Sequence, residues 1–170
     1  MSLSRLFLSA LIGVSSAAAQ SAATATIQPP AGRRLAPEFA LKDSAGKTVN
    51  LKKYRGKIVV LDFWATWCHG CKEEIPWFAE FERKYAAKGL RVVGVSLDED
   101  GWKVLKPFLA EAKIPYRIAL GDQSTANMYA IESMPDTFLI DRRGRIAATY
   151  NGVVDRANIE ANIQTMLGQQ

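Results

Sequence analysis

The feature that most constrains the fold is an apolar run near the middle of the chain, KIVVLDFW at residues 57–64. The run is nearly continuous and rich in β-branched and aromatic residues, whereas a strand with one face in water alternates apolar and polar residues. We therefore expect a central strand that is covered on both faces. A second run of the same kind, LRVVGVSL at residues 90–97, predicts another buried strand.

Helical patterns alternate with these strands. Apolar residues recur at helical spacing from Cys71 to Lys88, and a second amphipathic helix is expected at 101–113. The other expected elements are a hairpin within 39–51, a strand at 116–120, a helix at 123–131, a hairpin of 136–141 with 145–150, and a last helix capped by Asp155. This order predicts an α/β fold with a central mixed sheet flanked by helices.

The first nineteen residues differ in character from the rest. Arg5 precedes an apolar run at 6–14 and a small-residue stretch at 17–19, an arrangement typical of a signal peptide cleaved before Gln20. A second acceptable cleavage site ends at Ala25. The apolar run is shorter than the roughly 20 residues of a membrane-spanning helix, but an uncleaved anchor stays open. Export predicts a periplasmic or other extracytoplasmic location, where cysteine pairs can oxidise.

Residues 20–37 are small, polar and proline-bearing, a composition typical of a flexible linker. One folded domain is expected from residue 38 to residue 170. The net charge of the 170-residue chain is +5, but no Lys/Arg run exceeds two residues and no basic stripe carries interleaved aromatic residues. Nucleic-acid binding is therefore not expected, and we expect a monomer.

Both cysteines and the only histidine lie in WCHGC, residues 67–71. Zinc needs four ligands, and this stretch offers two thiolates and His69 within one loop. Covalent haem attachment requires a histidine after Cys71, where Lys72 stands. A disulfide that serves only stability would close a very short loop and gain little from it. Redox chemistry is the favoured interpretation, since the pair lies where a strand gives way to a helix.

That junction predicts different roles for the two thiols. A strand ending at Trp64 and a helix starting near Cys68 would place the Cys68 sulfur beside free backbone N–H groups and the positive end of the helix dipole. Such a position favours thiolate, which makes Cys68 the expected nucleophile. Cys71, one turn further on, should be more buried and suits a resolving thiol. Exchange of this kind requires neither an organic cofactor nor a metal, and we expect none beyond the redox-active disulfide.

Three stretches together resemble the thioredoxin superfamily, and within it the exported TlpA/ResA-like thiol-disulfide oxidoreductases with a redoxin domain. They are PEFALKDSAGKTVNLKKYRGK, VVLDFWATWCHGCKEEIP and SMPDTFLIDRRGRI. The resemblance spans roughly residues 36–168. It implies a thioredoxin fold with an N-terminal β-hairpin and a central helix-and-strand insertion at 98–120. It also implies protein substrates bearing disulfides or thiols, and an upstream membrane electron donor.

Further roles follow from the resemblance. Trp67 matches the tryptophan that flanks the active site, and Pro76 matches a proline that kinks the helix. Pro135 matches the cis-proline beside the disulfide. The backbone of Met134, which precedes it, would pair with an extended substrate segment.

Two acidic residues are candidates for handling the proton of Cys71. Asp62 stands where thioredoxin has its buried carboxylate, and an aspartate inside an apolar strand should have a raised pKa. Glu74 matches an acidic position of ResA-like proteins. The alternatives are a water-solvated strand position for Asp62 and an exposed first-turn acid for Glu74. The functional interpretation is the stronger one for Asp62.

The dipeptide between the cysteines departs from the family pattern, which usually has proline before the second cysteine. Here that residue is Gly70, which should loosen the loop. His69 offers a donor and a part-time positive charge beside the Cys68 sulfur, which should stabilise thiolate and make the pair a stronger oxidant. The alternative is that His69 is exposed and without effect.

The sequence thus predicts an exported protein disulfide oxidoreductase that works more as a reductase, in cytochrome c maturation or periplasmic disulfide reduction. Two other classes stay open. A thiol-dependent peroxidase would normally show T-x-x-C at its nucleophile, where this chain has C-x-x-C. A copper-handling thioredoxin-fold module would carry C-x-x-x-C and a distant histidine, and the chain has neither.

Overall fold

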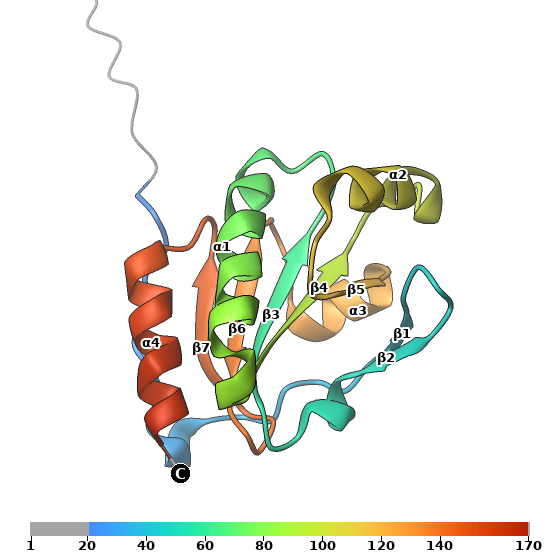
Figure 1. Cartoon of the computed structure of the whole chain (residues 1–170). Coiled ribbons are helices and arrows are strands. Elements are labelled where there is room, and N and C mark those ends of the chain that lie inside the picture. Colours follow the sequence, from blue (N-terminus) through green and yellow to red (C-terminus); the bar gives the residue numbers. More distant parts are fainter. Residues whose placement is uncertain (1–20, 170) are drawn as a thin grey trace, which may run out of the picture.

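The computed structural model describes residues 21–169, and a seven-stranded sheet forms its centre (Figure 1). The strands are β1 (Ala40–Lys42), β2 (Thr48–Asn50), β3 (Ile58–Trp64), β4 (Leu90–Ser96), β5 (Arg117–Leu120), β6 (Asp136–Ile140) and β7 (Ile146–Asn151). Their order is β2-β1-β5-β4-β3-β6-β7. The three central strands β5, β4 and β3 are parallel, while the pairs at both edges are antiparallel. The sheet is therefore mixed, as the sequence predicted.

Four α-helices cover the two faces of this sheet in the described part of the chain. They are α1 (His69–Tyr85), α2 (Trp102–Ala112), α3 (Gln123–Tyr129) and α4 (Arg156–Gly168). Short 3-10 turns occupy Pro30–Gly32, Leu51–Tyr54 and Ala86–Lys88. In Figure 1, α1 and α4 lie in front of the sheet and α3 lies behind it. The arrangement is the thioredoxin-like fold that the resemblance implied, with α2 and β5 as the central insertion.

Strand β3 is the centre of the packing, and all seven of its residues are buried. Successive side chains of a strand point to opposite faces. Ile58, Val60 and Trp64 accordingly pack into the core shared with α1 and α4. The odd-numbered residues, such as Phe63, pack into the core on the α3 side. This alternation assigns Asp62 to the same face as α1.

The segment before β1 departs from the sequence prediction. Over its described part, residues 21–37, it is not a free linker but lies along the domain. Ala23 forms a parallel bridge with Val154, and Leu35 forms an antiparallel bridge with Arg145. The physical reason is the alternation in ATATI, residues 23–27, whose alanines and isoleucine are partly buried against the core while both threonines are exposed. The contacts of the domain therefore begin near residue 23.

The predicted signal peptide at 1–19 lies outside the described residues. Among residues 21–169, no helix is both long enough and apolar enough to cross a membrane.

Candidate active site

Cys68 and Cys71 form a disulfide at the point where β3 gives way to α1, with Cα atoms 5.3 Å apart. Cys68 is the N-cap of α1, and its Sγ accepts a hydrogen bond from the Cys71 N–H at 3.2 Å. Cys68 keeps 6% of its surface exposed, whereas Cys71 has none. The two sulfurs thus differ in access, and the more accessible one lies where the first backbone N–H groups of the helix point.

The turn that leads into the helix is fixed by Asp98. Both the backbone N–H and the hydroxyl of Thr66 donate to its carboxylate, at 3.1 and 2.6 Å. The hydroxyl of Ser96 donates to the same carboxylate at 2.7 Å. The sequence pattern did not single out Asp98, and this residue does not cap the next helix, because the N-cap of α2 is Gly101. The clue in the sequence was that Thr66 and Asp98 each follow a predicted buried strand, and neighbouring parallel strands end at the same edge of a sheet.

The peptide bond between Met134 and Pro135 is cis and directly precedes β6. The Pro135 ring lies next to Gly70, since a Cβ atom added to that glycine would be 3.7 Å from its Cδ. Trp67, on the loop before Cys68, has 68% of its surface exposed. The structure therefore brings the cis-proline beside the disulfide and leaves a large aromatic side chain free next to it.

Asp62 is fully buried in the middle of β3. Its Oδ1 accepts a long hydrogen bond from the Thr137 hydroxyl at 3.4 Å, and its Oδ2 has no partner among the described residues. Burial in this apolar layer raises the pKa of Asp62 to about 7. The water-solvated alternative for this residue is wrong.

Glu74 is also fully buried, so its interpretation as an exposed first-turn acid is wrong. Its Oε1 accepts a hydrogen bond from the Val154 N–H at 2.7 Å, and its Oε2 has no partner within residues 21–169. Burial, and after it the charge of Asp62, raise the pKa of Glu74 to about 9. The sequence spacing could have indicated that Glu74 is buried, because residues i and i+3 share a helix face and Cys71 stands three residues before Glu74.

Two further polar groups share the interior with these acids. The indole N–H of Trp64 has no hydrogen-bond partner in the described part of the chain. Burial raises the pKa of Tyr116, and the charges of Asp62 and Glu74 raise it further. The layer between β3 and α1 that holds Cys71 therefore contains two carboxyl groups which repel each other's ionisation.

The two residues between the cysteines have different surroundings. The side chain of His69 is 93% exposed, and its Nε2 lies 3.7 Å from Oε1 of Glu73. Gly70 packs against Val153, whose Cγ2 would be 2.5 Å from a Cβ atom at that position. Packing therefore explains why residue 70 is glycine, because Val153 occupies the space that a larger side chain would need.

Within residues 21–169, no set of three or more His, Cys, Asp and Glu side chains is arranged to hold a metal ion.

Residues 33–149 match the family described as AhpC/TSA. The chain belongs to the AhpC/TSA family. Among curated relatives, the thiol-disulfide oxidoreductase ResA of Bacillus cereus is 33% identical over 131 residues, which are 76% of this chain and 75% of ResA. The ResA of Bacillus subtilis is 31% identical over 125 residues, covering 73% of this chain and 69% of that protein.

Solved structures of similar proteins have the same fold. A Chlorobium tepidum protein assigned as the thiol:disulfide interchange protein DsbE superposes with a TM-score of 0.76 at 36% identity, over 80% of this chain and 97% of that one. A secreted thiol-disulfide isomerase from Corynebacterium glutamicum has a TM-score of 0.77 at 18% identity, over 86% and 93% of the two chains, and supports the fold alone. The chain is a thiol-disulfide oxidoreductase with a redox-active Cys68–Cys71 pair.

Proposed function

We propose that the protein reduces disulfides of protein substrates outside the cytoplasm, using Cys68 as the nucleophile and Cys71 as the resolving thiol. The observation that carries this proposal is the asymmetry of the pair. Cys68 is accessible at the N-cap of α1, while Cys71 is buried in the layer that holds Asp62 and Glu74. A nucleophile that keeps some of its surface exposed, together with a fully buried thiol, suits two-step exchange.

In the first step the Cys68 thiolate attacks one sulfur of the substrate disulfide. A bond forms between Cys68 Sγ and that sulfur, the substrate S–S bond breaks, and the second substrate sulfur leaves as a thiolate that takes a proton from water. The Cys71 N–H, which points at Cys68 Sγ at 3.2 Å, and the helix dipole favour the thiolate that starts this step. Trp67 directly precedes Cys68 and is exposed, and Pro135 lies next to Gly70 between the two cysteines. We assign the Met134 backbone to the pairing with substrate.

In the second step Cys71 attacks Cys68. The Cys71 thiol gives its proton to a buried carboxylate, its sulfur bonds to Cys68 Sγ, and the substrate sulfur leaves as a thiol or thiolate. Two electrons have then passed from the enzyme to the substrate, and the Cys68–Cys71 disulfide remains for an upstream membrane donor to reduce.

Asp62 and Glu74 together accept this proton in our proposal. Burial raises the pKa of Asp62 to about 7 and that of Glu74 to about 9, the latter with a contribution from the charge of Asp62. The pair therefore retains at least one proton at neutral pH and titrates as a unit. Glu74, three residues after Cys71 on the same face of α1, is the member that we assign as the base, and the charge of Asp62 sets how far it is ionised.

The direction of electron flow is tested by the potential of the pair in a glutathione buffer. A value near that of thioredoxin, about −270 mV, supports a reductase, whereas a value near that of DsbA, about −120 mV, overturns that direction. The exposed His69 and the packed Gly70 are the tuning residues to vary in this measurement. Similarity to the ResA proteins supports the reductase direction, with apocytochrome cysteines and other extracytoplasmic disulfides as substrate classes.

The order of the two thiols is tested by trapping. The Cys71→Ser protein should accumulate a mixed disulfide with a reducible substrate, because nothing resolves the first adduct. Cys68→Ser should form none. Adduct formation by Cys68→Ser instead of Cys71→Ser would contradict the assignment, and rapid consumption of hydrogen peroxide by the purified protein would favour a peroxidase.

The extracytoplasmic location rests on the predicted signal at residues 1–19. Residues 1–25 fused to a reporter that is active only after export should yield activity. A reporter that stays inactive would place the protein in the cytoplasm.

A further inference from the structure

A single peptide group connects the redox site with the N-terminal part of the chain. The N–H of Val154 donates to Glu74 Oε1 at 2.7 Å. The C=O of Val153 accepts a hydrogen bond from the Ala23 N–H, also at 2.7 Å. These two groups are the opposite ends of the same peptide unit, so the three groups form a chain of hydrogen bonds. A bond at one end of such a chain polarises and strengthens the next bond.

The loop that contains this peptide group contacts the site at two further points. The Val153 side chain occupies the space beside Gly70 in the first turn of α1. The N–H of Gly152 donates to the carbonyl of Pro135 at 2.8 Å. The position of residues 152–154 therefore determines where the hydrogen-bond donor for Glu74 stands relative to the disulfide.

Residues 23–28, which we call the N-terminal strap, hold this loop from its other side. Ala23 and Ala25 are both partly buried against the core, and the backbone of each is hydrogen-bonded on both sides. The bonds are Ala23 N to Val153 O at 2.7 Å, Asp155 N to Ala23 O at 2.7 Å, Ala25 N to Asn158 Oδ1 at 3.0 Å, Asn162 Nδ2 to Ala25 O at 2.9 Å and Gln28 N to Ala147 O at 2.7 Å. The strap thus spans the space between β7 and the first two turns of α4.

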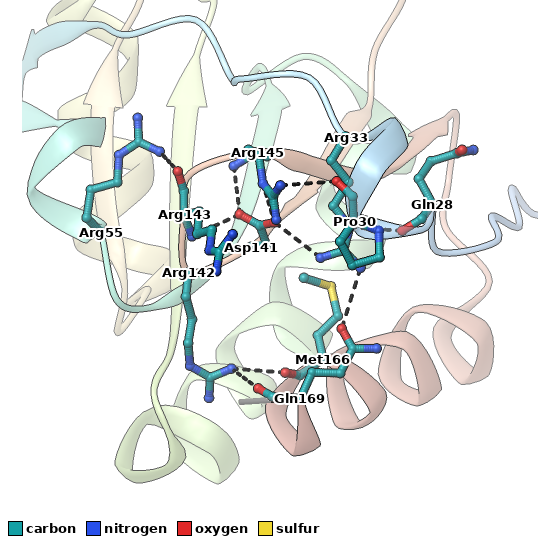
Figure 2. A network of polar contacts seen from close by, with 10 residues as sticks. All are labelled: Gln28, Pro30, Arg33, Arg55, Asp141, Arg142, Arg143, Arg145, Met166 and Gln169. Carbon is teal, nitrogen blue, oxygen red and sulfur yellow. Dashed lines mark hydrogen bonds and ion pairs between the residues drawn. The ribbon is translucent and has the colours of Figure 1, made fainter.

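A cluster of arginines holds the far end of the strap (Figure 2). The Arg33 side chain, only 4% exposed, pairs with Asp141 at 3.2 Å, and its Nε donates to the carbonyl of Gln28 at 2.8 Å. Arg145 donates to the carbonyl of Pro30 at 3.1 Å. Arg142 uses its donors on carbonyls at the end of α4, at 2.9 to 3.4 Å. These guanidinium groups are committed to internal acceptors, so the cluster fixes the strap and not a free anion.

We propose that the N-terminal strap is a positioning element of the redox site, which sets the place of the Glu74 carboxyl group, on the face of α1 that carries Cys71, through the Val153–Val154 peptide. This inference deepens the proposed function, on which its catalytic consequence rests. The strap carries no titratable side chain, since its residues are Ala, Thr, Ile and Gln. It therefore acts through backbone hydrogen bonds and not through charge.

Other titratable groups also act on Glu74. They are Asp62 on β3, Asp136 on β6, Glu73 on α1 and Tyr116 just before β5. None of them lies on the strap, so a change confined to the strap leaves these charges in place. Any response of Glu74 to such a change must come through the loop at 152–154.

The test removes one N–H group. Ala23→Pro eliminates the donor to Val153, because proline has no N–H. Thr26→Pro is the matched control, since Thr26 is exposed and its N–H makes no hydrogen bond within residues 21–169. NMR titration of the Glu74 carboxyl in the oxidised full chain measures its pKa directly. We expect Ala23→Pro to raise this pKa by roughly half a unit to one unit, because the Val154 bond to the carboxylate weakens, and we expect Thr26→Pro to leave it unchanged.

The kinetic consequence is measured in the resolution step. Below its pKa the ionised fraction of a base falls tenfold per unit, so Ala23→Pro should slow resolution by about three- to tenfold at neutral pH and shift its pH profile upward equally. In a Glu74→Gln background the same change should have no further effect on resolution. A full effect in that background, or an equal effect of Thr26→Pro, overturns the proposal.

Two outcomes separate this inference from the proposed function. If Glu74→Gln alone leaves resolution unchanged while Ala23→Pro still raises the Glu74 pKa, the proton role of Glu74 fails and its positioning by the strap stands. If Ala23→Pro leaves the Glu74 pKa unchanged, the strap proposal fails. Should Ala23→Pro not fold, Asn158→Ala removes the acceptor of the Ala25 N–H and must raise the pKa in the same direction; no rise again overturns the proposal.

Discussion

Two carboxyl groups share the protein interior at Asp62 and Glu74, where even one ionised carboxylate is unfavourable. Each has an oxygen with no hydrogen-bond partner among the described residues. An unpartnered buried oxygen destabilises the folded state, mainly in its charged form. Residues of this kind persist where the chemistry needs them, and here they lie on the side of the sheet covered by α1, which carries the thiol that must lose a proton in our proposal.

The stability of the oxidised protein should therefore fall as the pH rises. Asp62 ionises at about pH 4 in the unfolded chain, but burial keeps its proton in the folded state until a pH of about 7. The unfolded state then binds fewer protons than the folded state in this window, so the free energy of unfolding decreases with pH.

The substitution Asp62→Asn removes this titration and should stabilise the protein at pH 8 by a few kcal/mol, about 2–4, with a smaller gain at pH 5. It should also lower the pKa of Glu74, because a neighbouring negative charge is lost. Urea unfolding at both pH values measures the effect, with the exposed Asp100→Asn as control. An equal gain at pH 5 and pH 8 would contradict the titration argument.

The contact between Gly70 and Val153 allows a second test at the residue level. Gly70 lies in α1, where alanine is normally more favourable than glycine. Gly70→Ala should nevertheless destabilise the protein by about 1–3 kcal/mol, because the new Cβ would meet the Val153 Cγ2. Val153→Ala in the same chain removes that atom and should restore most of the loss. Thermal unfolding of the two single variants and the double variant gives the coupling energy, and additive effects would show that the two residues do not compete for space.

At the level of elements, Asp141 joins the β6–β7 turn to the segment that follows the strap. Burial alone would raise the pKa of Asp141, but hydrogen bonds from the backbone and side chain of Arg145 and from Arg33 lower it. A lowered pKa means that the carboxylate stabilises the folded state above its unfolded pKa of about 4 and ceases to do so as the pH falls through the folded value.

Asp141→Asn should accordingly destabilise the protein by roughly 1–3 kcal/mol at pH 7, and the difference from the unchanged protein should shrink toward pH 3. Chemical unfolding across this pH range measures the difference. The exposed Glu99→Gln is a suitable control that should show little effect at either pH. A difference that stays constant with pH would mean that the charge of Asp141 contributes nothing.

The elements themselves were predictable where the pattern is local. The composition of residues 57–64 is enough to predict a strand covered on both faces. Asp155 stands before an apolar helical pattern and therefore predicts an N-cap. The structure confirms it, because the Asp155 carboxylate accepts a hydrogen bond from the Asn158 N–H at 2.8 Å. The strap was missed because small and proline residues outweighed a five-residue alternation, ATATI. Such an alternation becomes a strand-like segment only through partners on β7 and α4.

The candidate site also has a part that could be predicted from local sequence and a part that could not. The cysteines and Asp62 belong to one strand–helix junction and could be located from the sequence. The burial of Glu74 depends on the Val154 N–H, eighty positions further along the chain. The Thr66–Asp98 contact joins residues 32 positions apart. Contacts at such separations have no local signature, because they arise only when the sheet brings the chain segments together.

For the whole molecule, the position at which the predicted signal peptide is cleaved decides whether the mature protein keeps the strap. Cleavage after Ala19 leaves Ala23 and Ala25 in the mature chain, whereas cleavage after Ala25 removes both. Because the strap holds the loop that positions Glu74, we expect the mature protein to begin before Ala23, or to retain its N-terminus as an anchor. Intact mass and N-terminal sequencing of the exported protein measure this directly.

A chain that begins at Thr26 provides the complementary measurement. It lacks the Ala23 N–H and both backbone groups of Ala25, so Val153 loses its outer hydrogen-bond donor and α4 loses its bonds from Asn158 and Asn162 to the strap. We expect this shortened chain to resolve mixed disulfides about three- to tenfold more slowly than a chain that begins at Gln20. The attack by Cys68 should be little changed, because its thiolate is stabilised by the first turn of α1 and not by the strap. A mature protein that starts at Thr26 and resolves at the full rate would show that the domain positions its buried acid without the segment before it.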